Sequence, residues 1–258
     1  MLTKIHFITV NFKQDNFVRS LIEEVTSIDN CFLTIIDNSR TMEQIRSERY
    51  QIVGSDNVGY LPGLKKGLKH IELKSNQKVV LLNPDIKITA DFIENVKAAT
   101  LKRYDMIAPS VIDSETGVDQ NPNLTRPYSL VRKILVNLEF SSYPTYFLIN
   151  KVKACLRPFK NLQRKTSEKV SQKIHWAHGS IMIFNAGLFL DFDFDTPDVF
   201  LWGEEAIIAN WVHVNGGEIY YVPALEVIHL SKSATTKIVA RSRFKIWRDS
   251  YRIYKAFL

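Results

Sequence analysis

The sequence has few cysteines and no long apolar run. Its two cysteines, Cys31 and Cys155, lie far apart without the close spacing of a metal site. A disulfide scaffold is therefore not expected, and a reducing cytosol fits this composition. No apolar run reaches the about 18 residues of a spanning helix, and the first residues do not have the layout of a signal peptide. We expect a soluble cytoplasmic protein, or one bound peripherally to a membrane surface.

The sequence also lacks internal repeats and low-complexity linkers. Hydrophobic residues make up 45% and charged residues 24% of the 258 residues, which is enough for one substantial core. The formal net charge is +7. A basic balance suits nucleic acid, an anionic membrane surface or a phosphorylated ligand, and does not choose among them.

Short apolar runs alternate with stretches of helical periodicity over residues 1–110. We predict helices between the runs, with Pro62 and Thr89 typical of helix starts. Strands separated by helices predict an α/β fold with a doubly wound, mostly parallel sheet, whose ligands bind beyond the carboxyl ends of the strands. The predicted strands are 5–10, 33–36, 51–53, 79–82 and 106–108.

The middle of the chain and its tail are basic and aromatic. Residues 126–173 contain eleven Lys or Arg and two acids, and we predict helices and loops there. Beyond them we predict strands at 176–184 and 218–222, a helix at 204–214 and a basic amphipathic helix at 240–258. This pattern suits docking to an anionic membrane. A helical subdomain with a solvated basic face explains it equally well.

Acids stand where two of the predicted strands end. Asp85 follows an apolar strand and a proline, where a carboxylate would be a hard ligand for Mg²⁺ or Mn²⁺ on a diphosphate. Asp37 could accept hydrogen bonds from a nucleobase or a ribose. For each acid, a strand-ending turn is the structural alternative.

Other candidates have structural alternatives as well. Asn57 and Gly59 precede a helix and could approach a phosphate, although the loop lacks both the P-loop and the G-x-G-x-x-G pattern. Glu204 and Glu205 either stabilise a helix dipole or supply a general base. His229 is either structural or a metal ligand beside Asp85.

Six short elements occur in an informative order. They are Val10-Asn11-Phe12, Ile36-Asp37-Asn38-Ser39, Asn57-Val58-Gly59-Tyr60, Leu82-Asn83-Pro84-Asp85, Gly203-Glu204-Glu205 and Val227-Ile228-His229. This series resembles the family 2 glycosyltransferases of the GT-A fold, a Rossmann-like fold. The nearest group is similar to the rhamnosyl- and galactofuranosyltransferases of bacterial surface polysaccharide synthesis. The resemblance covers roughly residues 3–110 and 175–235.

The resemblance implies a GT-A domain at 1–235 and a C-terminal helix at 236–258. Within the domain, 1–110 would bind the nucleotide sugar, 111–174 would be a basic insertion, and 175–235 would carry the acceptor and catalytic side. The implied roles are nucleobase contact for Asp37, a donor site at Val10, Asn11, Asn57, Gly59 and Asn83, metal binding by Asp85 and His229, a base at Glu205 or Glu204, and an acceptor side at Gly179, Ser180 and Trp202.

Two departures from the family pattern affect the chemistry. Asn83-Pro84 replaces further acids, which would leave Asp85 as the only side-chain ligand on that loop. Glu205 replaces the usual aspartate, and its extra methylene moves the carboxylate by about an ångström. The backbone has shifted to suit, or Glu204 is the base, or activity is lost.

The expected activity is therefore inverting, metal-dependent sugar transfer. The expected partners are a UDP- or dTDP-sugar donor and a saccharide or lipid-linked saccharide acceptor. The alternative is a catalytically degenerate protein of the same fold that binds a nucleotide sugar or a partner. A nucleic-acid partner is not expected, because it would leave the ordered strand-end acids unexplained.

Overall fold

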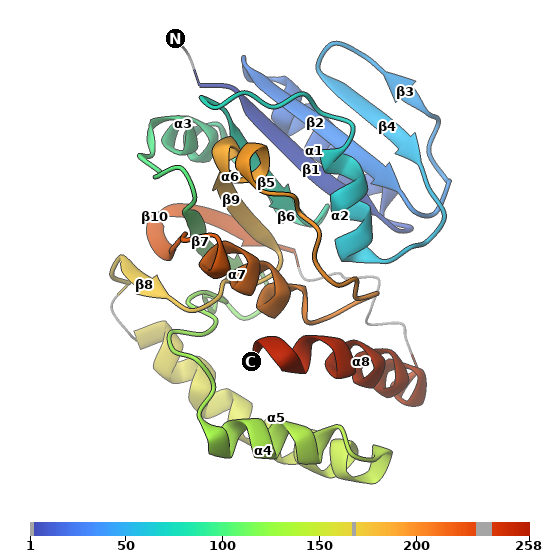
Figure 1. Ribbon diagram of the computed structural model, residues 1–258, viewed down its shortest axis with the longest axis vertical. Helices are drawn as coiled ribbons and strands as arrows, with labels where there is room; N and C mark the ends of the chain where they lie inside the picture. The colour runs from blue at the N-terminus through green and yellow to red at the C-terminus, as the bar shows by residue number, and fades with distance from the viewer. Residues whose placement is uncertain (1–2, 167–168, 231–238) are drawn as a thin grey trace.

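A ten-stranded sheet forms the centre of the protein (Figure 1). The computed structural model describes residues 3–166, 169–230 and 239–258. The strand order is β3-β4-β2-β1-β5-β9-β7-β10-β6, and β8 pairs with β10. The strands are β1 (Ile5–Asn11), β2 (Cys31–Asp37), β3 (Ile45–Arg46), β4 (Tyr50–Gly54), β5 (Lys78–Leu82), β6 (Ile86–Lys87), β7 (Met106–Asp113), β8 (Gln172–Ile174), β9 (Ile181–Asn185) and β10 (Ile219–His229).

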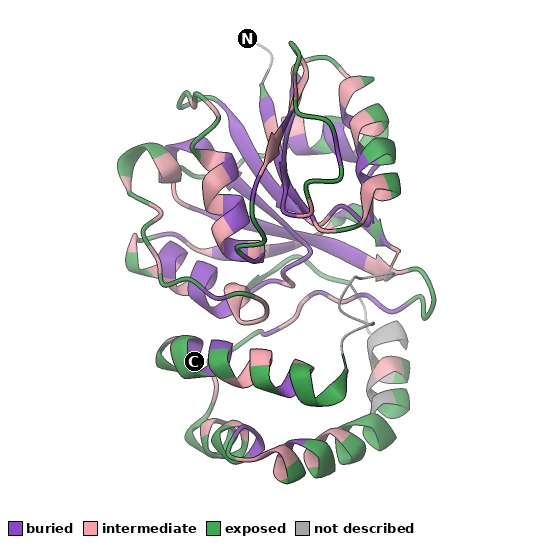
Figure 2. Cartoon of the chain, turned by 90° about the vertical axis from the view of Figure 1, so that its right-hand side faces the viewer, coloured by how far each residue is buried: buried purple, intermediate pink, exposed green. Residues whose placement is uncertain are grey.

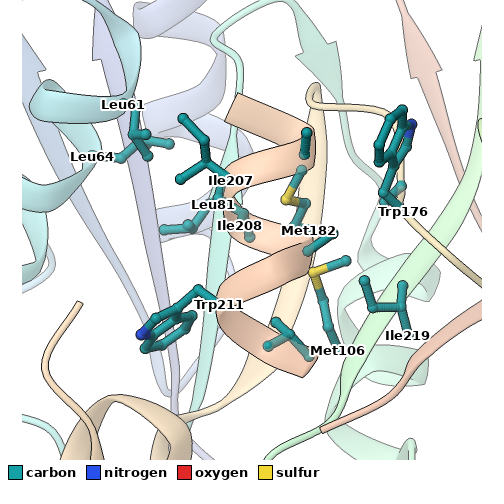
Figure 3. Close-up of a cluster of buried hydrophobic side chains, with 14 of the residues drawn as sticks. Leu61, Leu64, Leu81, Met106, Trp176, Met182, Ile207, Ile208, Trp211 and Ile219 are labelled. Atoms are coloured by element: carbon teal, nitrogen blue, oxygen red, sulfur yellow. The ribbon is translucent and has the colours of Figure 1, made fainter. Parts of the chain in front are cut away.

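Helices cover both faces of this sheet. On one face, α1 and α3 bury Leu21 and Phe92 against the strands. On the other, α2 and α7 bury Leu61, Leu64 and Trp211 around Leu81 and Met182, as Figure 3 shows. The helices are α1 (Asp15–Thr26), α2 (Tyr60–Leu68), α3 (Ala90–Ala98), α4 (Leu130–Glu139), α5 (Tyr143–Thr166), α6 (Ala186–Asp191), α7 (Glu204–Val214) and α8 (Ala240–Tyr254), followed by a short 3₁₀ turn (Lys255–Phe257).

The α/β fold agrees with the sequence prediction, and the sheet itself is mixed. The pairs β1–β2, β1–β5, β2–β4 and β7–β10 are parallel, as expected from helical crossovers. The strand β9 runs antiparallel to both β5 and β7. The reason is that β9 starts beside the end of β5, where Ile181 pairs with Leu82, and then runs back across the sheet.

Two predicted strands have different bounds in the structure. The strand predicted at 176–184 is Ile181–Asn185 in the structure. Residues 175–180 form a loop instead, in which the N–H groups of His175 and Trp176 donate to Leu124 O. The strand predicted at 218–222 continues to His229 through a register shift between Val222 and Glu226. This irregularity lets β10 carry His229 to the edge of the sheet where β5 and β1 end.

The insertion and the tail pack together as a helical layer. Phe140 stacks on Tyr251 with ring centroids 4.6 Å apart, and Tyr146 packs on Phe244 at 5.1 Å. The Tyr251 hydroxyl donates to Asn137 Oδ1 at 2.6 Å. Figure 1 shows α8 between the α4–α5 hairpin and α7. Among the described helices, none combines the length and hydropathy needed to cross a bilayer.

Candidate active site

A cavity of about 380 Å³ lies at the carboxyl edge of β1 and β5. Among the predicted site residues, it brings together Val10, Asn57, Gly59, Asn83, Asp85, Gly179, Ser180, Trp202, Glu204, Glu205 and His229. Asn11 and Asp37 do not line it. Residues distant in sequence thus meet in one place, at the edge where the fold predicts a ligand.

Asp85 and His229 face each other at the base of this cavity. Asp85 is 1% exposed, and its Oδ1 lies 3.4 Å from His229 Nε2. Both carboxylate oxygens of Asp85 and the Nε2 of His229 are buried without a hydrogen-bond partner. Unpaired buried groups of this kind are costly, so a binding role is the better explanation.

The orientation of His229 follows from Gln120. Gln120 Oε1 lies 2.8 Å from His229 Nδ1. Because an amide oxygen only accepts, this contact requires a proton on Nδ1, and Nε2 is the ring nitrogen that faces Asp85 and is able to bind a cation in the neutral imidazole. A carboxylate and an imidazole lone pair suit a divalent cation. No cluster of three or more His, Cys, Asp or Glu side chains that could hold a metal occurs in the described residues.

Glu204 and Glu205 begin α7, and their carboxylates lie close to Gly179. A Cβ on Gly179 would lie 3.0 Å from Glu205 Oε1 and 3.1 Å from Glu204 Oε1, so a side chain there would require the carboxylates to shift. Burial, together with the Glu205 charge, raises the pKa of Glu204 well above its usual value. Burial also raises the pKa of Glu205, but N–H groups of Gly203 and Gly179 stabilise its charged form. The pKa of both acids is therefore raised, and the N–H groups of Gly203 and Gly179 favour a negative charge on Glu205 over one on Glu204.

The turn before α7 is strained and supported by the tail helix. Trp202 and Gly203 have φ values of +63° and +96°. Trp202 stacks on Trp247 with centroids 5.0 Å apart, and Ser250 Oγ donates to Leu201 O at 2.6 Å. A Cβ on Gly203 would lie 2.0 Å from Tyr254 Cδ1. The sequence-predicted basic tail thus fixes the position of both glutamates.

Replacing Gly203 by alanine should therefore lower the free energy of unfolding by more than the strain of a positive φ alone would. Gly216 provides a matched control, because its φ is +78° but no atom lies within 4 Å of its Cβ position. We expect Gly216→Ala to lower the free energy of unfolding by about 1 kcal/mol. Gly203→Ala should lower it by roughly 3 kcal/mol, because a ring must also move. Denaturant unfolding measures both, and equal losses would contradict this role of α8.

The loop before α2 is in contact with Phe200, another residue that lines the cavity. Gly59 has φ +98°, and a Cβ there would lie 2.5 Å from Phe200 O. Tyr60 N donates to Phe200 O at 2.9 Å. Burial and the nearby acids Glu204, Asp85 and Glu205 raise the pKa of Tyr60 well above its usual value. Tyr60 therefore remains a neutral phenol inside the cavity.

Asp37 is committed to its own loop. It is 0% exposed, and its oxygens accept hydrogen bonds from Asn11 Nδ2 at 3.0 Å and Met42 N at 2.8 Å. Ser39 donates to it as well, from N at 3.1 Å and Oγ at 2.7 Å. This geometry is the strand-ending turn that the sequence offered as an alternative. Nucleobase contact by Asp37 stays a prediction.

Two residues near the metal-type pair were not singled out by sequence reasoning. His178 was expected in a strand, whereas it lies in a loop, lines the cavity, and has its ring 5.8 Å from that of His229. Its position next to Gly179-Ser180 was a usable signal. Residues 111–125 contain no motif that would single out Gln120, and only the folded structure places it beside His229.

Comparisons with known proteins support the fold. The chain matches no sequence family and no curated protein sequence. Among solved structures, it is similar to GalNAc-T7 with UDP, GalNAc and Mn²⁺, with a TM-score of 0.57 and 11% identity over 99% of this chain and 51% of that one. It is also similar to the mannosyltransferase PcManGT from Pyrobaculum calidifontis in complex with GDP-Man and Mn²⁺, with a TM-score of 0.52 and 11% identity over 98% of this chain and 65% of that one.

These likenesses confirm the GT-A fold expected from the sequence. The chain spans about half the length of GalNAc-T7 and under two thirds of the mannosyltransferase. At 11% identity, the likeness shows the fold and leaves the activity to be argued from the site.

Proposed function

We propose that this protein is an inverting, metal-dependent glycosyltransferase. The observation that carries the proposal is the meeting of two acidic groups in one cavity. One is Asp85 with His229, buried and without hydrogen-bond partners on the facing atoms. The other is the Glu204–Glu205 pair, which lines the same cavity beside Gly179. A cation site and a base that share one cavity suit group transfer from a diphosphate.

Asp85 and His229 would hold the divalent cation, Mg²⁺ or Mn²⁺. When bound, the cation would neutralise charge on the departing nucleoside diphosphate. The described residues that line the cavity include no Lys or Arg. Gln120 would fix the imidazole, as groups behind a metal ligand commonly do.

Glu205 would act as the general base in a single displacement. Its carboxylate takes the proton of an acceptor hydroxyl while that oxygen attacks the anomeric carbon. The bond from the anomeric carbon to the diphosphate oxygen breaks on the opposite face, so the configuration inverts. Glu204, whose neutral form is favoured by burial and by the charge of Glu205, would hold the pair in place without competing for the proton.

The substrates follow from the resemblance and the structural neighbours. The neighbours contain UDP in one case and GDP-Man in the other, which supports a nucleotide-linked donor. We propose a UDP- or dTDP-sugar, with Val10, Asn57, Gly59 and Asn83 on the donor side and Gly179, Ser180 and Trp202 on the acceptor side. The acceptor would be a saccharide or lipid-linked saccharide of bacterial surface polysaccharide synthesis, reached in the cytoplasm. The rhamnosyl or galactofuranosyl type, and the division at 110, 174 and 235, rest on the sequence resemblance.

Thermal unfolding with candidate ligands tests this proposal. We expect UDP, dTDP or their sugars to raise the melting temperature by several degrees only when Mn²⁺ is also present, because binding to the folded state stabilises it. Gln120→Ala should weaken Mn²⁺ binding in the nucleotide complex by about tenfold or more. Nucleotide binding that is indifferent to Mn²⁺ and to Gln120 would contradict the cation site.

A further inference from the structure

The α4–α5 hairpin exposes an unusual amount of apolar surface. Figure 2 shows these helices largely exposed at the edge of the molecule farthest from the sheet. Of nineteen exposed large hydrophobic side chains in the described residues, eleven fall between 130 and 162. They are Leu130, Val131, Ile134, Leu135, Leu138, Phe147, Leu148, Val152, Leu156, Phe159 and Leu162.

The opposite side of the hairpin is fixed to the protein. Phe140 and Tyr146 are buried against the aromatic residues of α8. Between the two helices, Glu139 is 4% exposed and bonds to Lys153 Nζ at 2.5 Å and Asn150 Nδ2 at 3.1 Å. The hairpin is therefore held in place on one side, whereas the large apolar side chains on its other side are exposed. Apolar exposure concentrated on one element in this way marks an interaction site.

The charge of the hairpin identifies the kind of partner. Residues 126–166 contain nine Lys or Arg and one acid, Glu139, which is already paired. Arg132 lies over the Tyr128 ring at 3.8 Å and Lys151 over the Phe147 ring at 4.7 Å, so cationic heads border the apolar side chains. A second copy of this surface would be repelled by like charge. An anionic lipid surface satisfies both the apolar and the basic groups.

We propose that the α4–α5 hairpin docks in the plane of an anionic bilayer, with its exposed apolar side chains inserted among the acyl chains. The tail helix does not share this role, because its aromatic residues pack against Phe140, Tyr146 and Trp202. The docking surface lies outside the cavity, whose lining includes no residue of α4 or α5. Docking itself does not depend on the proposed function. Only its purpose does, which is to bring the cavity to a lipid-linked acceptor.

Vesicle co-sedimentation of the full chain tests this docking without any donor. The probes are vesicles of phosphatidylglycerol with phosphatidylethanolamine, and vesicles of phosphatidylcholine alone. We expect binding to the anionic vesicles that weakens with added salt, and at least tenfold weaker binding to phosphatidylcholine. The variant Leu130→Gln, Ile134→Gln, Leu148→Gln and Phe159→Gln should lose tenfold or more in affinity. The matched control changes exposed residues elsewhere, as Val170→Gln, Leu190→Gln and Val214→Gln, and should bind like the wild type.

Thermal unfolding checks that both variants are folded, which exposed positions favour. No binding of the wild type to anionic vesicles would overturn the proposal. So would equal binding by the hairpin variant and the control. Sedimentation velocity tests whether a second copy of the chain occupies this surface instead. If the wild type forms a dimer, the hairpin variant does not, and neither binds vesicles, the surface serves self-association. Because no activity is measured, these results are separate from the fate of the transferase assignment.

Discussion

Asp85→Asn is expected to abolish sugar transfer and, at the same time, to stabilise the metal-free protein. Loss of the cation ligand should lower kcat/KM on the order of a thousandfold, because several kcal/mol of charge stabilisation are lost. In the absence of metal, the change removes a buried charge whose oxygens have no hydrogen-bond partner. The free energy of unfolding should then rise by about 1 kcal/mol. Activity assays and denaturant unfolding in chelator measure the two effects.

A second buried aspartate provides the control for this prediction. Asp105 is 6% exposed, and its Oδ1 accepts the N–H of Glu218 at 2.9 Å. Asp105→Asn weakens a satisfied hydrogen bond, so it should lower the free energy of unfolding by about 1 kcal/mol and leave the Mn²⁺ response intact. The cation site is wrong if Asp85→Asn keeps full turnover, or if it destabilises the metal-free protein as Asp105→Asn does.

Glu205→Gln is expected to reduce kcat by about 10² to 10⁴-fold while donor binding stays unchanged. The reason is that an amide cannot take the proton of the acceptor hydroxyl. Glu204→Gln is the matched variant: because burial and the Glu205 charge raise the pKa of Glu204 and favour its neutral form, a neutral amide should cost less than about tenfold. Initial rates and Mn²⁺-dependent thermal shifts with the donor separate catalysis from binding.

The pH dependence should follow the same pair. Glu205 must be ionised to act, so activity falls as pH drops through its folded-state pKa, which burial places above that of an ordinary glutamate. The raised pKa of Glu204 also makes the free energy of unfolding depend on pH. Stability is complete below the pKa that Glu204 has in the unfolded chain, and it is lost as pH rises through the higher pKa of the folded protein. Because Gln cannot ionise, Glu204→Gln should raise the free energy of unfolding at neutral pH.

Three outcomes would count against these roles. Full turnover by both glutamine variants would exclude a base at this pair. A larger loss in Glu204→Gln would exchange the roles of the two acids. A wild-type protein that binds nucleotide with Mn²⁺ but neither transfers nor hydrolyses the sugar would be a binding protein of this fold, with Glu205 in place of aspartate as the reason.

The sequence predicted the first half of the fold well because its strands are short apolar runs buried on both faces. A continuous apolar run predicts a strand that is buried on both faces. Ile5 in β1, Leu33 in β2 and Val79 in β5 are each at most 1% exposed, as this pattern predicts. The ends of these strands also placed Asp85 and Asn83 correctly at the cavity. Helical crossovers alone determine that part of the sheet.

The later strands and the environment of the site depend on tertiary contacts that no local pattern contains. The run at 176–184 looks like one strand, but Trp176 bonds to Leu124 and only 181–185 pair with β5. Asp37 follows a strand as expected, yet its oxygens are taken up by Asn11, Ser39 and Met42. The support of the turn before α7 by α8 joins residues such as Leu201 and Ser250, which are distant in sequence.

The central position of β9 has a consequence for how the chain folds. This strand arrives after the helical insertion, yet it separates β5 from β7 and bonds to both. Until it is in place, the strands β4, β2, β1 and β5 have an open, apolar border in the middle of the sheet. Neither half can close its own core, so we expect the two to melt in one cooperative transition. Assembling the cavity and completing the sheet are then coupled, since the segment that leads into β9 also carries Gly179 and Ser180, which line the cavity.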